Sequence, residues 1–389
     1  MAHPADLLTT ERLLTLTKAL VAMPSVTRHE QRFAMWTADF LTDLGLRNLQ
    51  RLPVAESGDT IVAEYGITDG PAMMLNFHLD TFDVFDGWRT DPFTPTLEDG
   101  RLYGLGAHDM KGGAACLLGA VEAIVQSGVQ LHGRMVVSAT SDEENWSRGA
   151  HALIQSGALV GCSACLVPEP SQIGTLTIGQ RGRHVFRLAF FGQAAHAAFG
   201  GGVNAVVDAA RVVARLAEPG AVDLGRHADF DMTGSLSVIG LHGGGTLILV
   251  PERAEVWIDR HILPGEHAEE AAAQIRAVVT ACAIESRWEL SWDQRPTPAP
   301  GPFIVDPGSA LVQIVSRHLA REQECAIQLV LGRSVADTSH IAVHGGVPTL
   351  ICGPQGGNTC TANEYVEIES LLPIARTYVY SVLDLLGAD

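Results

Sequence analysis

The sequence has few cationic residues for its acidic content, with 26 Lys and Arg against 44 Asp and Glu and a formal net charge of −18 at pH 7. Nucleic acids and anionic membrane surfaces are bound by clusters of Lys and Arg, so we expect neither partner. The chain also lacks an apolar run of about 18 residues, the length needed to span a membrane. Its first residues, MAHPADLLTTERLL, lack a cationic start followed by an apolar stretch, so we expect no secretory signal.

The cysteines are seven, an odd number, and they are scattered along the chain. This pattern suits a reducing compartment better than a disulfide framework, so we expect a cytoplasmic protein. Cys162 and Cys165 form a single C-x-x-C inside an apolar run. Without a second such pair, plain burial of these two side chains is favoured over a zinc knuckle or a redox site.

A chain of 389 residues is too long for one ordinary hydrophobic core, so we expect two domains. Residues 1–182 alternate apolar strands with helices, which predicts a parallel sheet covered on both faces. Residues 183–294 follow the order β-α-β-β-α-β, the plan of a ferredoxin-like α+β domain. After the Pro-rich segment RPTPAPGP, residues 295–389 resume the first pattern. The predicted fold class is therefore α/β, a mostly parallel-sheet catalytic domain with an inserted ferredoxin-like lid.

The stretch FHLDTFDV places a histidine and an aspartate at the end of an apolar strand. Alternate residues of a strand point to the same face, so His78 and Asp80 share one side. A carboxylate beside an imidazole commonly fixes the orientation of a metal-ligating histidine. Taken alone, the stretch favours a capped strand end with a solvated histidine over a metal ligand.

Other chemically competent residues follow further strands and turns, where ligands bind in open parallel sheets. Adjacent acids such as Glu143 and Glu144 can take different roles at a metal ion, one as a ligand and the other as the acceptor of a proton from bound water. One histidine with several carboxylates predicts a two-metal site in which His78 is a ligand and Asp80 orients it. The further residues at these positions are Asp109, Glu169 and Cys360.

Several motifs together resemble the zinc aminoacylase/carboxypeptidase family, which includes acetylornithine deacetylase, succinyl-diaminopimelate desuccinylase and glutamate carboxypeptidases. They are HLD, YGLGAHDMKGG, TSDEEN, PEPS, GQAAHAAFGGGVNAV, DRHILPGE and NEYVEIESL, and they span nearly the whole chain in the family's order. The resemblance implies that His78, Asp109 and Glu169 hold one metal ion. It also implies that Asp109 bridges to a second ion held by Glu144 and a C-terminal histidine. Glu143 would then be the general base, with one or two zinc ions per chain, or cobalt or manganese in their place.

Two residues of the predicted lid acquire roles through the same resemblance. His196 matches a histidine that, in dimeric members, reaches the partner's active site and stabilises the oxyanion, so a homodimer formed through the lid is expected. The alternative for His196 is an ordinary histidine at a helix start. Arg260 matches a position often used to bind the substrate carboxylate, and a surface ion pair is the alternative there.

The sequence departs from the family at two positions. The last metal ligand should stand three residues before the Asn-Glu pair of NEYV, and that residue is Cys360 rather than histidine. A thiolate binds zinc well, so the second site either survives with altered charge or is weakened or lost. Ile248 stands where relatives usually carry an asparagine that touches substrate or oxyanion, so the substrate is not fixed by the resemblance.

The leading hypothesis is a metal-dependent hydrolase in which a metal-bound hydroxide attacks the amide of an N-acyl amino acid or short peptide, with Glu143 as general base. A non-hydrolytic metal-binding relative and a hydrolase of a related C–N bond are the alternatives. The segment Asp337–His340 is open to two interpretations, a substrate contact or an ordinary Ser/Thr/Asp turn.

Overall fold

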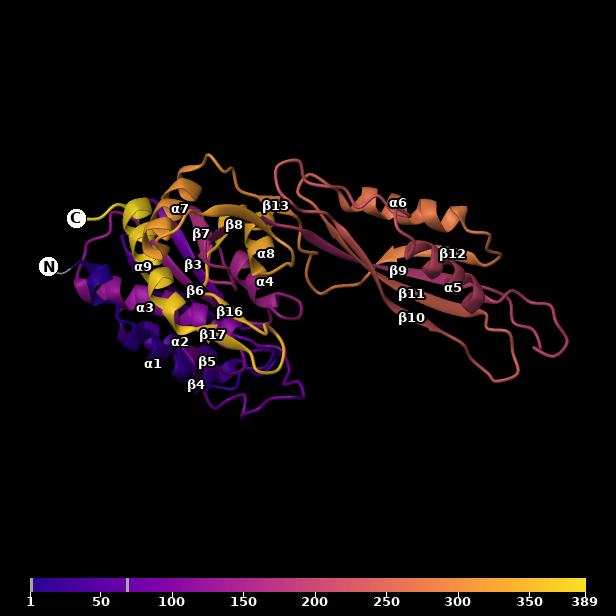
Figure 1. Ribbon diagram of the computed structural model, residues 1–389, viewed down its shortest axis with the longest axis horizontal. Helices are drawn as coiled ribbons and strands as arrows, with labels where there is room; N and C mark the ends of the chain where they lie inside the picture. The colour runs from indigo at the N-terminus through magenta and orange to yellow at the C-terminus, as the bar shows by residue number, and fades with distance from the viewer. Residues whose placement is uncertain (1–2, 68–69) are drawn as a thin grey trace. The chain divides into compact units, whose positions relative to one another are not determined.

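The computed structural model describes residues 3–67 and 70–389, which form two compact units (Figure 1). The first unit contains the residues up to Gly179 together with Ile304–Gly332 and Ala336–Asp389. The second contains Gln180–Phe303 and the short segment Arg333–Val335. Each unit has its own sheet and its own covering helices, so they are described one at a time.

The second unit extends beyond the predicted range of 183–294, and backbone contacts account for the difference. The N–H of Arg183 donates to the carbonyl of Pro300 at 2.9 Å, which ties the Pro-rich segment to the first strand of this unit. The guanidinium Nε of Arg181 donates to the carbonyl of Arg333 at 2.7 Å. The predicted linker is therefore part of the second unit.

The central sheet of the first unit is mixed rather than mostly parallel. Its order is β1-β2-β6-β3-β7-β15-β8, with β13 and β14 also paired to β8. The pairs β6–β3, β3–β7 and β7–β15 are parallel, whereas β1–β2, β2–β6 and β15–β8 are antiparallel. The strands are β1 (Arg47–Leu52), β2 (Thr60–Gly66), β3 (Ala72–His78), β6 (Arg134–Thr140), β7 (Cys162–Val167), β8 (Thr175–Gln180), β13 (Phe303–Ile304), β14 (Gln328–Gly332) and β15 (Thr349–Ile351).

Helices cover this sheet on both faces, as the complete burial of every residue of β3 requires. Two of them, α3 and α4, are the crossovers that make β3, β6 and β7 parallel. Helix α7 begins where the Ser309 side chain accepts the N–H of Val312, and α3 ends at Gly128 in the left-handed region. The helices are η1 (Pro4–Leu7), α1 (Thr10–Val21), α2 (Gln31–Asp43), η2 (Ala107–Lys111), α3 (Gly112–Ser127), α4 (Arg148–Gln155), α7 (Ala310–Gln323), α8 (Asp337–Val343) and α9 (Ile368–Leu386).

A small antiparallel sheet of very short strands joins distant parts of the first unit. Its order is β16-β17-β5-β4, formed by β16 (Gly356–Gly357), β17 (Tyr365–Glu367), β5 (Arg101–Tyr103) and β4 (Thr96–Glu98). The sheet therefore brings the C-terminal NEYV motif beside the turn that contains Asp109.

The second unit is an antiparallel sheet of order β10-β11-β9-β12 with two helices packed on it. Its chain order is β9 (Gly182–Phe191), α5 (Ala205–Leu216), β10 (Ser235–Gly243), β11 (Arg253–Ile262), α6 (Ala268–Ala281) and β12 (Arg287–Trp292), which is the β-α-β-β-α-β order expected from the sequence. Alternate residues of β9, including Phe186, Leu188 and Phe190, are buried against the apolar faces of α5 and α6. Asn204 begins α5 by accepting the N–H groups of Val206 and Val207.

No helix among residues 3–67 and 70–389 is long and apolar enough to cross a bilayer.

Candidate metal centre

His78 stands at the end of β3 and points its two ring nitrogens at different partners. Nδ1 lies 2.9 Å from the backbone carbonyl of Asp80, and because a carbonyl only accepts, Nδ1 carries the proton. Nε2 lies 3.1 Å from Oδ1 of Asp109 and 3.9 Å from Oε1 of Glu169. Burial lowers the pKa of His78, but the hydrogen bond to Asp109 and the charges of Glu169 and Glu143 raise it well above its usual range, so Nε2 carries a proton toward these carboxylates. A metal ion would take the place of that proton, with Nε2 as its ligand.

The Asp80 carboxylate was predicted to orient the His78 ring, but it lies 3.8 Å from Nδ1 of His78. The backbone carbonyl of Asp80 makes the nearer contact to that nitrogen. Its Oδ1 accepts the N–H of Glu143 at 3.0 Å, and its Oδ2 accepts the N–H of Glu144 at 3.1 Å. The hydroxyl of Thr27 also donates to Oδ2, at 2.9 Å. Asp80 thus holds the turn with the two glutamates in place, while burial raises its pKa to about 7.

Glu364 organises the turn that presents Asp109, a role that the sequence did not reveal. Its Oε1 accepts the N–H groups of His108 at 3.0 Å and Asp109 at 2.8 Å, and its Oε2 accepts that of Gly106 at 2.8 Å. The Asp109–Met110 peptide bond is cis. Burial, followed by the neighbouring Asp109, raises the pKa of Glu364 to about 8. Glu364 belongs to the NEYV motif, and three backbone donors converging on one carboxylate are not visible in a sequence pattern.

The position of Glu169, two residues beyond β7, depends on a close approach between backbones. A Cβ added at Gly113, at the start of α3, would lie 2.1 Å from the carbonyl oxygen of Pro168. A Cβ added at Gly353 would lie 2.1 Å from the carbonyl oxygen of Glu169 itself. Both glycines are therefore needed for Glu169 to reach the cluster.

Cys360 points into the same cluster, although it lies far along the chain. Its Sγ is 3.3 Å from Oδ2 of Asp109, the carboxylate oxygen that His78 does not contact. Cys360 has φ of 57°, and the flanking Asn358 and Asn363 have φ of 52° and 60°. Left-handed backbone is unfavourable for cysteine, so the turn holds this residue in a conformation it rarely adopts alone.

The predicted ligands form overlapping groups in which one donor atom from each residue lies within 4.8 Å of the others. His78, Asp109 and Glu169 form one group, and Asp109, Glu144 and Cys360 form another. Asp109 is common to both, which is the arrangement of a carboxylate that bridges two cations. A further group joins His78 to Glu143 and Glu144.

The electrostatics of the cluster suit positive ions. Burial raises the pKa of Glu143 and of Glu144 well above the usual range, and the neighbouring carboxylates raise both further. Burial, followed by Asp109, raises the pKa of Glu169 to about 8. Oε1 of Glu144 and Oε1 of Glu169 are buried without a hydrogen-bond partner among the described residues. Divalent cations would offset the repulsion and supply those oxygens with a partner, so the donor set fits metal.

The segment Asp337–His340 is the start of α8 rather than an open turn. Asp337 is 1% exposed, and burial raises its pKa to about 6. Its charge is among those that raise the pKa of Glu143 and of Glu169, so it lies close to the cluster.

The other two predicted site residues belong to the second unit. His196 is exposed, and its ring stacks on Phe199 with ring centroids 4.5 Å apart. Arg260 is 1% exposed and lies 3.6 Å from Glu266. Arg260 is therefore an interior ion-pair partner of this unit rather than a surface residue.

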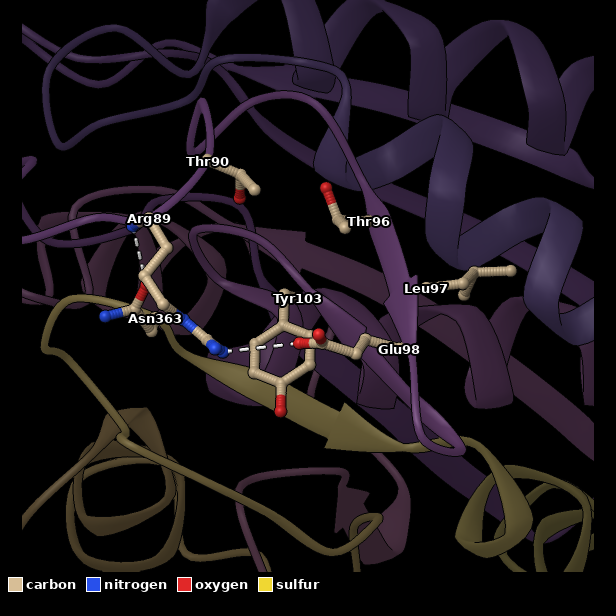
Figure 2. Close-up of a pocket in the computed structure, with 7 residues that line it drawn as sticks. All are labelled: Arg89, Thr90, Thr96, Leu97, Glu98, Tyr103 and Asn363. Carbon is tan, nitrogen blue, oxygen red and sulfur yellow. Dashed lines mark hydrogen bonds and ion pairs between the residues drawn. The ribbon is translucent and has the colours of Figure 1, made fainter.

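A separate pocket lies beside the turn with Cys360, and Figure 2 shows its lining. Asn363 accepts the N–H of Arg89 at 2.8 Å and donates to the carbonyl of Gly87 at 3.0 Å. The side chain of Arg89 pairs with Glu98 at 3.5 Å (Figure 2). None of the predicted ligands lines this pocket, so we assign it no chemistry; its contacts anchor the turn that ends in Glu364.

Comparison with known proteins shows the family of the chain. Residues 74–384 match the peptidase family M20/M25/M40. N-formyl-4-amino-5-aminomethyl-2-methylpyrimidine deformylase of Bacillus subtilis is 26% identical over 94% of this chain and 92% of that protein. Acetylornithine deacetylase of Edwardsiella ictaluri is 26% identical over 92% of this chain and 94% of that protein.

Solved structures share the fold. A tripeptidase of Staphylococcus aureus aligns with a TM-score of 0.81 at 21% identity, over 98% of this chain and 99% of that one. A dinuclear metal-binding peptidase of family M20 from Bacillus subtilis aligns with a TM-score of 0.72 at 15% identity, over 97% and 98% of the two chains. At these identities the likeness shows the fold alone.

Proposed function

The chain belongs to the peptidase family M20/M25/M40 and is a hydrolase of C–N amide bonds, and on that premise we propose that it removes the acyl group of an N-acyl amino acid or cleaves a short peptide. The observation that carries the proposal is Asp109, whose two carboxylate oxygens face His78 and Cys360 separately. A carboxylate shared between two sets of ligands is the arrangement that a two-metal hydrolase requires.

We propose that His78, Asp109 and Glu169 hold one ion, and that Asp109, Glu144 and Cys360 hold the other. Histidine, carboxylate and thiolate together favour zinc, with cobalt or manganese as alternatives. When bound, the ions supply Lewis acidity that polarises the amide carbonyl and lowers the pKa of bound water.

Glu143 is the proposed general base, and the structure supports it in two ways. Its backbone N–H donates a hydrogen bond to the Asp80 carboxylate at 3.0 Å, which fixes the backbone from which the Glu143 side chain extends. It also lies beside the ligands His78 and Glu144. The carboxylate takes the proton of the attacking water and passes it to the leaving amine, which departs neutral.

We further propose that the second unit acts as a lid and as the dimerisation surface, with His196 reaching the partner's active site and Arg260 binding the substrate carboxylate. Support for dimerisation comes from apolar side chains on this unit, since Leu247 is fully exposed, Phe199 is 85% exposed and Ile248 is 56% exposed. Arg260 is buried beside Glu266, so a substrate carboxylate bound there would replace Glu266 as its ion-pair partner. A cytoplasmic location is proposed from the scattered free cysteines.

A substrate panel on metal-loaded and chelator-treated protein tests the function. The panel contains N-formyl, N-acetyl and N-succinyl amino acids, dipeptides, tripeptides and N-carbamoyl compounds. We expect release of a free amine from one N-acyl or peptide class, lost on chelation and restored by zinc. Turnover of carbamoyl compounds alone would indicate the related C–N hydrolase. Stoichiometric metal with no turnover of any compound would indicate the non-hydrolytic relative and overturn the proposal.

A further inference from the structure

Three histidines converge outside the acidic cluster, between α4 and α8 of the first unit. His151 lies on α4, His340 lies on α8, and His344 is the residue that caps α8. One ring nitrogen from each lies within 4.8 Å of the other two. Nε2 of His151 and Nδ1 of His340 are 2.9 Å apart.

The backbone arranges these rings as a three-sided site. His340 and His344 are four residues apart, so successive turns of one helix place them on the same face. Their ring centroids are 5.7 Å apart, and the centroid of His151 lies 4.8 Å from that of His340 and 5.5 Å from that of His344. Histidines four apart on a helix, joined by a third from a packed neighbour, form a common zinc-binding geometry.

We propose that His151, His340 and His344 bind one transition-metal ion at a site distinct from the acidic cluster. All three donors are imidazole nitrogens, a set that suits Zn²⁺, Cu²⁺ and Ni²⁺ and not Mg²⁺ or Ca²⁺, which require oxygen. Two nitrogens bound to one tetrahedral Zn²⁺ at 2.0–2.1 Å are separated by about 3.3 Å. The His151–His340 pair at 2.9 Å is close to that separation, and His344 completes the set by a small movement.

The burial of the three rings permits this movement. His340 is 1% exposed, so packing holds it in place, whereas His344 is exposed, which leaves space for its ring to turn toward the other two. Without metal, one proton lies between His151 and His340 in an ordinary hydrogen bond. Metal binding displaces that proton from between the rings; the ring that carried it keeps it on its other nitrogen, so both rings can offer a lone pair to the metal.

The position of the site gives it a structural consequence. Helix α4 follows directly on the turn that holds Glu143 and Glu144, and α8 begins at Asp337 beside the acidic cluster. A metal bound between the two helices would fasten both segments and stabilise the native state by mass action. The bound metal would therefore stabilise the positions of the segments that carry the acidic cluster. This proposal does not depend on the proposed substrate class.

Zinc titration of the full chain tests the site, with the same His78→Ala background in every variant so that any zinc held by the acidic cluster contributes equally. His78→Ala protein, stripped of metal, is titrated with Zn²⁺ and measured by metal analysis after gel filtration and by thermal unfolding. We expect His78→Ala to retain a zinc ion and to melt at a higher temperature with zinc but not with Mg²⁺. The double variant His78→Ala/His344→Gln should lose one zinc equivalent and that rise in melting temperature.

The matched control is His78→Ala/His29→Gln, because His29 is another exposed histidine of the first unit. This control should keep the zinc and the stabilisation. His78→Ala/His151→Gln serves as a second test from α4, and its circular dichroism reports whether it folds. Equal zinc content and equal stabilisation in the His344→Gln double variant and in the control would overturn the proposal. Hydrolysis by His344→Gln in the wild-type background, with the acidic cluster loaded, tests the proposed function separately.

Discussion

Cys360 and His78 take different oxygens of the same carboxylate, with Sγ of Cys360 at 3.3 Å from Oδ2 of Asp109 and Nε2 of His78 at 3.1 Å from Oδ1. The short sulfur contact requires the thiol proton, because two anions would repel at that distance. Burial, followed by Asp109 and Glu144, accordingly raises the pKa of the Cys360 thiol far above its usual range. The thiol proton occupies the position that a second metal ion would take if Cys360 bound it as a thiolate.

Replacement of Cys360 therefore decides whether the second metal uses it. Cys360→Ser should lose one metal ion, because a hydroxyl is a far weaker zinc ligand than a thiolate. Cys360→His should keep two ions and shift the pH optimum, since a neutral ligand replaces an anionic one. Metal analysis and pH–rate profiles of the three proteins check both statements. Two metals held with unchanged affinity in Cys360→Ser would show that the cysteine is not a ligand.

Glu143→Gln should bind metal normally and lose turnover by at least about a hundredfold, the usual scale for a general base. Glutamine keeps the size of the side chain and the backbone contact to Asp80 but cannot take a proton. Metal content and turnover on the best compound of the panel are the measurements. Glu369→Gln, an exposed glutamate at the start of α9, is the control and should behave as wild type. Comparable turnover in the two variants would remove Glu143 from this role.

Glu364→Gln should weaken metal binding about 10- to 100-fold without replacing any ligand. A carboxamide has only one accepting oxygen, so at least one of the N–H groups of Gly106, His108 and Asp109 loses its acceptor. The turn then presents Asp109 less well. Competition with a zinc chelator measures the affinity, again with Glu369→Gln as control. An unchanged zinc affinity would mean that the turn holds its shape without Glu364.

Much of this site could be predicted from the sequence because it follows strand ends. His78 ends β3, Glu143 and Glu144 follow β6, and Glu169 follows β7, and these strands lie side by side and parallel. Apolar runs identify such strands, and parallel pairing brings their carboxyl ends to one edge. The Gly-rich turn after the last strand indicated that Cys360 lies near this edge, but its role as a ligand came from the resemblance, because a turn with three left-handed residues has no periodic signal.

The parts that the sequence missed are those without an apolar pattern. Strand β1 lies at the sheet edge with no fully buried residue, so its sequence RNLQRL lacks the alternation of a half-buried strand. Strands of two or three residues, such as β5 and β17, are too short to show a period of two. The small sheet was missed because its strands are so short, and the antiparallel edge at β1 was missed because it lacks this alternation, so the central sheet was predicted as mostly parallel.

The second unit should lose stability in mild acid through His184. Burial, followed by the charges of Arg295 and Arg260, lowers the pKa of His184 to about 4. In the unfolded chain His184 takes up a proton near pH 6.5, whereas in the folded chain it does so only near pH 4. The free energy of unfolding therefore falls as pH falls from about 6.5 to about 4. At pH 5 the loss from this residue is about 2 kcal/mol.

His184→Phe should remove that loss, because phenylalanine keeps the ring packed against Trp292, whose centroid is 5.6 Å away, and does not titrate. Denaturant unfolding at pH 7 and pH 5 measures the difference. His242→Gln, an exposed histidine on β10 of the same unit, should retain the acid sensitivity of the wild type. The same fall in stability in His184→Phe as in wild type would contradict the assignment.

Complementation between two inactive variants distinguishes a His196 that acts within its own chain from one that acts across a dimer. His196→Ala and Glu143→Gln should each be nearly inactive as pure proteins. In a mixed dimer, one active site would combine an intact Glu143 with the intact His196 of the other subunit, and would therefore work. If the two variants pair at random, half of the dimers contain one subunit of each, and each of these has one working site out of two. Co-expression should therefore restore about a quarter of wild-type turnover. Light scattering checks that the dimers form. If His196 acts in its own chain, every mixed dimer lacks one of the two groups in each site, and no activity returns.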